Sequence, residues 1–276
     1  GQELIWENGT LTINEFSTTT ADLMSDQSFL FGRNGAFTGN VSVSEGNKKA
    51  QFMALAVDSD KKEIKVDSLT ATDSQQMQAS VSGLTIKGYS IDNFLFENRL
   101  SLTYLSTAGS SLSFYQSEDQ LTSQILNLPL HSIQIDSLQM ANNQWTLVDS
   151  LTSRSLALHD LNINSEGVRL DSLTNLKRWF SYVKNISVSG EDFVESLGES
   201  YKISVADYSY DLEDNRIELN KVALNPILDR YSYSEQLTSQ KSWYQVDVEN
   251  ITVRDIDYEA MSRGRYHIGN IKLDQV

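Results

Sequence analysis

The chain has 276 residues, 39% of them apolar, so it is long enough to bury a sizeable core. Its 37 acidic and 22 basic residues give a net charge of −15, and this surface repels phosphate backbones and anionic headgroups, which makes nucleic acid a poor partner. Cysteine is absent, which excludes disulfides, zinc–thiolate sites and thiol catalysis. No apolar run is long enough to cross a membrane, and because Gly1 is not a natural start residue, we expect a piece of a longer protein.

Alternation of apolar and polar residues is the dominant signal along the chain, and it predicts half-buried β-strands. Leu4 to Ile13 is predicted to be a hairpin, because Asn8-Gly9 supplies the two positive-φ residues that a tight turn needs. Further strands are predicted around 41–43, 64–66, 133–135, 186–188, 203–205, 217–219 and 246–248. Turn residues at 34–35, 58–60 and 213–215, together with Pro129 and Pro226, indicate strand ends.

Helical signals are few. Residues 173–184 have helical spacing with Ser172 as a possible cap, and shorter candidates lie at 193–197 and 232–240. We therefore expect about one tenth helix, well below a typical globular protein. The predicted organisation is an N-terminal β-repeat region over 1–172, a short helical connector over 173–185 and a C-terminal β-repeat region over 186–276.

An internal repeat underlies this division. The pattern [Ile/Leu/Val]-x-[Ile/Leu/Val]-x-x-[Leu or aromatic] begins at residues 64, 100, 133, 168 and 203, which are steps of 36, 33, 35 and 35 residues. Three copies share Asp-Ser-Leu, and we interpret this Asp as a solvent-facing residue at a strand end. Because one unit cannot bury its apolar face alone, neighbouring units should stack into an elongated all-β structure.

Residues typical of catalysis or metal binding are scarce. The three histidines, His131, His159 and His267, are isolated, and no phosphate-binding glycine loop or nucleophile motif occurs, so we predict no enzyme activity, catalytic residue, metal or cofactor. Residues 58–60 and 211–215 crowd oxygen ligands, but they lack the pattern of an EF-hand and are interpreted as acidic turns. An aromatic-rich stretch is expected to fill the core, or else to line a groove; it comprises Tyr201, Tyr208, Tyr210, Tyr231, Tyr233, Trp243 and Tyr244.

Several segments resemble AsmA-like envelope proteins. Residues 133–147 are similar to the strand-turn-strand unit of that family, and residues 4–13 resemble half of one unit. Residues 201–226, which end in Asn-Pro, and the strand at 243–253 resemble large AsmA-like proteins of the Bacteroidetes type. This resemblance implies a long curled sheet shaped like a taco, with an apolar inner groove that guides lipid between membranes and no catalytic residues. It also implies a periplasmic location with an inner-membrane anchor, which these residues lack.

Inward residues of the repeat are the candidate lining of such a groove, where buried acyl chains gain about 0.8 kcal/mol per CH₂. The candidates are Ile64, Val66, Leu69, Leu100, Leu102, Ile133, Ile135, Leu138, Val168 and Leu170. The same residues would form an ordinary closed core if the sheet packed on another. A rival hypothesis is an extracellular structural or adhesive β-repeat module that binds glycan or protein, and a third is a glycan-active β-helix enzyme. The ligand and the oligomeric state are left open.

Overall fold

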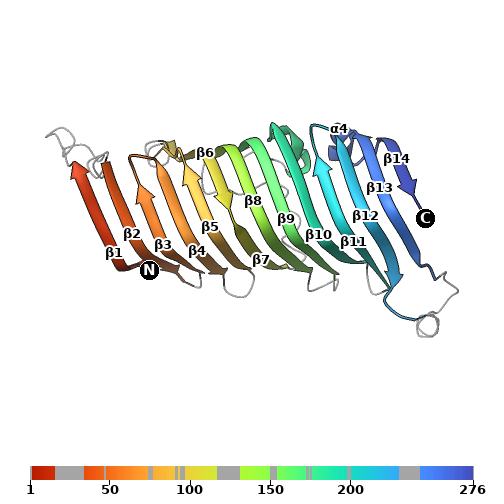
Figure 1. Ribbon diagram of the computed structural model, residues 1–276, viewed down its shortest axis with the longest axis horizontal. Helices are drawn as coiled ribbons and strands as arrows, with labels where there is room; N and C mark the ends of the chain where they lie inside the picture. Colours follow the sequence, from red (N-terminus) through yellow and green to blue (C-terminus); the bar gives the residue numbers. More distant parts are fainter. Residues whose placement is uncertain are drawn as a thin grey trace.

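The computed structural model contains one large β-sheet, drawn in Figure 1 as a row of neighbouring strands along the longest axis of the molecule. The prediction of an all-β chain that forms an elongated, curled sheet is confirmed. None of the helices among the described residues has the length and apolar character needed to cross a membrane. The structure describes residues 2–15, 34–46, 48–73, 77–90, 93, 97–116, 131–149, 154–171, 174, 176–197, 200–229 and 243–275.

The strands follow one another in space almost as they do in sequence, in the order β1-β2-β3-β4-β5-β6-β8-β9-β10-β11-β12-β13-β14. The N-terminal strands are β1 (Gln2–Glu15), β2 (Asn34–Glu45), β3 (Lys48–Asp58), β4 (Glu63–Asp73), β5 (Met77–Lys87), β6 (Arg99–Thr107) and β7 (Gly109–Gln116). The C-terminal strands are β8 (Ser132–Asp149), β9 (Arg154–Asp171), β10 (Asn185–Leu197), β11 (Tyr201–Asp211), β12 (Arg216–Pro226), β13 (Val246–Ile256) and β14 (Ile268–Asp274). The helices with described bounds are both short: the 3₁₀ helix η2 (Leu176–Ser181) and α4 (Tyr258–Ser262).

Strand pairing is antiparallel except at one place. β6 and β7 are separated by Ala108, and each pairs with β5 on one side and with β8 on the other, so together they occupy the position of one long strand. Both run parallel to β8. A parallel neighbour cannot be reached by a tight hairpin. The sheet is therefore two antiparallel meanders, β1–β7 and β8–β14, joined side by side.

A row of bulges crosses the sheet from β3 to β12. At this level the cross-strand register shifts or is interrupted, as between Gly39 and Val41 on β2 and between Met140 and Asn143 on β8. Such bulges and kinks bend a sheet. Residues with φ between 45° and 58° occupy the row on six strands, and they are Ala54, Gly83, Asn142, Asp160, Asp192 and Lys221.

Asparagine side chains satisfy backbone groups that the bulges remove from the ladder. Asn40 Oδ1 accepts a hydrogen bond from the Ala54 backbone N at 2.9 Å, and Asn162 Oδ1 accepts one from the Asn142 backbone N at 3.1 Å. The buried Asn143 Nδ2 donates to the Leu161 carbonyl at 2.6 Å. Since unpaired buried backbone groups are costly, these contacts stabilise the bend.

The spacing of the repeat also has a structural cause. Ile133, Ile135 and Leu138 all pack in one apolar cluster, so both residues between the second and third positions turn to the other face. The copy that begins at Leu100 packs in the same way, and Ile203, Val205 and Tyr208 do so in a second cluster. An ideal strand would place every second residue on the same face. The spacing of the repeat therefore marks strands that carry one additional outward-facing residue.

Three local predictions were wrong or incomplete. Asn8-Gly9 does not form a hairpin: β1 runs through it, and the register against β2 shifts between Glu7 and Thr10, so the pair forms a bulge. Residues 193–197 are part of β10 and not a helix. The helix expected at 173–184 is the shorter η2. The candidate at 232–240 lies outside the described residues. The turns predicted at 58–60 and 213–215 are confirmed by turns at 59–62 and 212–215, and the strand end at Pro226 is confirmed.

We predict that Lys221→Val destabilises the protein by roughly 1–2 kcal/mol, because Lys221 is exposed but has φ of 51°, where a β-branched side chain is strained. Lys221→Asn should be neutral or stabilising, since Asn tolerates this conformation. Urea unfolding measures both. Lys202→Val is the matched control on β11, exposed without positive φ; equal losses at Lys202 and Lys221 would contradict the bulge.

Candidate functional site

One face of the sheet, called here the inner face, carries an unbroken row of mostly apolar residues from β6 to β14. Each member pairs directly with the next across the neighbouring strands. Seven inter-strand steps of about 4.8 Å make the row about 34 Å long. The row comprises Thr107, Met140, Ile163, Val188, Tyr210, Ile217, Val253 and Ile271.

The opposite face is mostly polar, as shown by the residues that alternate with this row. Gln139 pairs with Asn164, Asn164 with Ser187, and Ser187 with Asp211. Because bulges place additional residues on this side, the strands bend toward the apolar side. The inner face is thus the concave one.

Eight of the ten predicted lining residues lie together in one apolar cluster, called here the central cluster. They come from β4, β6, β8 and β9 and are Ile64, Leu100, Leu102, Ile133, Ile135, Leu138, Val168 and Leu170. Val66 is buried beside Leu84 on β5, and Leu69 is half-buried; neither is a member of the cluster.

Part of the central cluster is covered by segments outside the strands. Tyr89, just after β5, and Val183, just after η2, pack on it, and Leu102 and Ile135 are only 3% and 7% exposed. Burial is the main factor that raises the pKa of Tyr89, whose hydroxyl has no hydrogen-bond partner among the residues that the structure describes. This end of the inner face is a closed core rather than an open groove.

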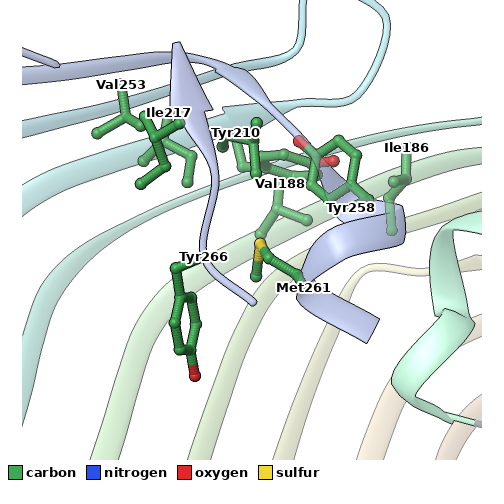
Figure 2. Close-up of a pocket in the computed structure, with 10 residues that line it drawn as sticks. Ile186, Val188, Tyr210, Ile217, Val253, Tyr258, Met261 and Tyr266 are labelled. Carbon is green, nitrogen blue, oxygen red and sulfur yellow. The ribbon is translucent and has the colours of Figure 1, made fainter. Parts of the chain in front are cut away.

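The C-terminal end of the inner face is open and contains a pocket of about 560 Å³ (Figure 2). Its floor comes from β10 to β13, with Val188, Ile217 and Val253 among the contributors. Tyr258 and Met261 from α4, with Tyr266 beyond it, lie over this floor. The described residues that line it are all Ile, Val, Met or Tyr, and none of them is charged.

Two tyrosine rings in the pocket wall lie against each other. The rings of Tyr210 and Tyr258 meet edge-on, with centroids 6.3 Å apart. Burial raises the pKa of Tyr210, and the neighbouring Tyr258 hydroxyl raises it further. Burial also raises the pKa of Tyr258. Both phenols are therefore neutral at physiological pH, and the wall presents an uncharged surface.

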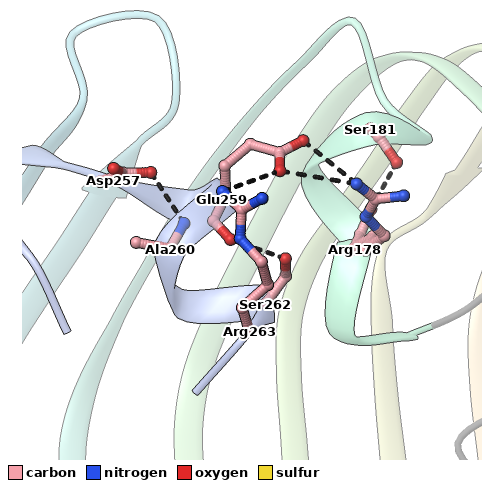
Figure 3. Close-up of polar contacts among 7 residues, drawn as sticks. All are labelled: Arg178, Ser181, Asp257, Glu259, Ala260, Ser262 and Arg263. Atoms are coloured by element: carbon pink, nitrogen blue, oxygen red, sulfur yellow. Dashed lines mark hydrogen bonds and ion pairs between the residues drawn. The ribbon is translucent and has the colours of Figure 1, made fainter. Parts of the chain in front are cut away.

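Polar contacts hold α4 in place at the rim (Figure 3). Asp257 caps the helix by accepting a hydrogen bond from the Ala260 backbone N at 2.8 Å. Glu259 forms ion pairs with Arg178 of η2 at 3.3 Å and with Arg263 at 3.6 Å. The rings of Phe180 and Tyr258 lie 5.6 Å apart. No residue of α4 is fully buried, so these rim contacts, together with the packing of the Tyr258 ring, position the helix.

The acidic turns and histidines form no comparable site. Asp58 accepts hydrogen bonds from the Lys61 Nζ at 2.6 Å and backbone N at 3.1 Å, and these contacts lower the pKa of Asp58. His131, His159 and His267 are all exposed. Within the part of the chain that the structure describes, no group of three or more His, Cys, Asp or Glu residues is arranged to hold a metal.

The aromatic-rich stretch divides between the core and the pocket. Tyr208 packs in the second cluster and contacts Gly190 of β10, and Tyr210 lines the pocket, whereas Tyr244 is exposed. Tyr231 and Tyr233 lie outside the described residues. The sequence analysis did not predict the helix that roofs the pocket. The signals for it in the sequence are Asp257, which precedes this helix of five residues, and Gly264, which follows it.

No known protein family, curated protein or solved structure matches this chain.

We predict that Ile135→Ala costs about 2–4 kcal/mol of unfolding free energy, because Ile135 is 7% exposed in the closed part of the inner face. Ile271→Ala makes the same change on the same face, but Ile271 is 58% exposed, so less than about 1 kcal/mol should be lost. Chemical denaturation measures both variants. Similar losses would show that the C-terminal end of the face is also covered.

Proposed function

We propose that this chain is a non-enzymatic cell-envelope segment whose inner face shields the acyl chains of lipids and guides them between membranes. The observation that supports this proposal most strongly is the continuous, mostly apolar row of side chains on the inner face from β6 to β14. Its length of about 34 Å exceeds the roughly 15 Å that one leaflet contributes to a bilayer core, so a whole acyl chain fits along it. The resemblance to AsmA-like proteins supports this function, together with a periplasmic location and an inner-membrane anchor.

The exposure of the inner face supports lipid as the ligand. Among the residues that the structure describes, half of the twelve exposed large apolar side chains lie between residues 246 and 273, and Met261, Tyr266 and Ile268 among them line the pocket. Exposed apolar groups that gather in this way mark binding surfaces. Along the inner face, the central cluster would close one end of the lipid-binding surface, and the pocket would lie toward the other end.

A glycan-binding module is less well supported. Stacking on sugars requires aromatic rings with free faces. Tyr104, an aromatic residue of the polar face, has the Lys87 Nζ 5.7 Å from its ring centroid and donates a hydrogen bond from its hydroxyl to Gln139 at 2.8 Å.

Mass spectrometry of an organic extract from gently purified protein tests the proposal. We expect phospholipid at near-stoichiometric level, and none from an unrelated cysteine-free β-protein purified in parallel. Ile163→Asp places a charge in the middle of the row and should reduce bound lipid about tenfold or more. Asn164→Asp, the neighbouring outward residue, is the matched control. Absence of lipid, or equal lipid in both variants, would overturn the proposal.

A further inference from the structure

The pocket beneath α4 is built differently from the rest of the inner face. Its floor is the rigid sheet, whereas its roof is a helix of five residues without a buried side chain. Met261 and Tyr266 line the pocket and yet are 41% and 83% exposed. A roof that only completed a core would bury these side chains against the floor. The space between roof and floor is instead open to an apolar occupant.

The charge at the rim differs from that of the whole chain. The net charge of the chain is −15, but the segment that follows α4 reads Arg263-Gly264-Arg265-Tyr266-His267. Gly264 has φ of 73°, and the Gly264 and Arg265 backbone N atoms donate to the carbonyls of Met261 and Ala260 at 2.9 Å each. This cap fixes the path of the basic segment beside Tyr266.

Arg265 is the residue of this segment that is suited to an anionic ligand. Arg263 shares Glu259 with Arg178, whereas Arg265 is exposed and makes no ion pair with any residue that the structure describes. Guanidinium groups bind carboxylates and phosphates through paired hydrogen bonds. An uncharged pocket next to a basic rim is complementary to an apolar tail with an anionic head.

We propose that the pocket binds one acyl chain that carries an anionic head, with the chain between α4 and the floor and the head at Arg265. This inference rests on the proposed function and deepens it, because it identifies the C-terminal pocket as a separate site for a single chain. Carboxylate and phosphate share the required chemistry, so the head could be that of a fatty acid or of a lysophospholipid.

Titration calorimetry of the full chain with three probes tests this inference: fatty acids of 8 to 16 carbons, lysophosphatidylglycerol with matched chains and the matched uncharged alcohols. Affinity should rise about fourfold per methylene until the pocket is filled and then level off. Tighter binding of the fatty acid or of the lysophospholipid at equal chain length identifies the head. Arg265→Glu should weaken both anionic probes at least about tenfold and leave the alcohols unchanged. Arg169→Glu, an exposed residue on β9, is the control.

Met261→Trp narrows the pocket and should shift the levelling-off to shorter chains. Met53→Trp is the matched control, because Met53 is also an exposed methionine, at 50%, on β3. Circular dichroism checks that both variants fold. Identical chain-length profiles for the two, or no binding of the single-chain probes to the unaltered protein, would overturn this inference. Neither result would affect the phospholipid extraction and the Ile163→Asp comparison, which judge the proposed function separately.

Discussion

The structure depends on one constraint: a long single sheet with one apolar face must bend toward that face. The bulge row supplies the bend, and it crosses nine strand positions from β3 to β12 at one level. Asn and Asp at positions such as 142, 160 and 192 adopt positive φ at lower cost than most residues. Asn142 Nδ2 also donates to the Ala108 carbonyl, and the nearby Asn143 and Asn162 side chains hydrogen-bond the backbone that the bulges disturb, so the sequence supports the bend in two ways.

The sheet is a single layer, so much of its concave face stays accessible to a ligand. The chain exposes 18287 Å², whereas a compact monomer of 31.0 kDa exposes about 12,000 Å². Tyr89 and the segment after η2 cover the central cluster, while α4 leaves space above the floor near the other end. The covered central cluster therefore stabilises the fold, whereas the open C-terminal part of the same face is available for binding.

Sequence patterns predicted the sheet well, because alternation depends only on which residues face inward. They predicted its connections less well. Asn8-Gly9 suits both a hairpin turn and a bulge, since each needs positive φ, and only the partner strand β2 decides between them. Phe193, Val194 and Leu197 imitate helical spacing because Asp192 interrupts the alternation. The parallel step from β6 and β7 to β8 depends on strand order, which alternation does not encode.

The candidate site was predictable in part for the same reason. The repeat pattern found eight members of the central cluster, since those residues pair across regular strands. It did not indicate that Tyr89 and Val183 cover them, because neither residue belongs to the repeat. The pocket depends on α4, whose five residues are too few for a periodic signal. Its contacts with η2, such as that between Glu259 and Arg178, join residues that are far apart in sequence.

The central claim is that the sheet is a single open layer, and an electron-spin distance measurement tests it most directly. Because the chain has no cysteine, Thr38→Cys and Arg254→Cys introduce two specific labelling sites on the outer face. Both belong to one cross-strand row, ten inter-strand steps apart. An open sheet predicts a separation of about 48 Å between the two positions. A separation of about half that value would show that the sheet folds back on itself and would contradict the account.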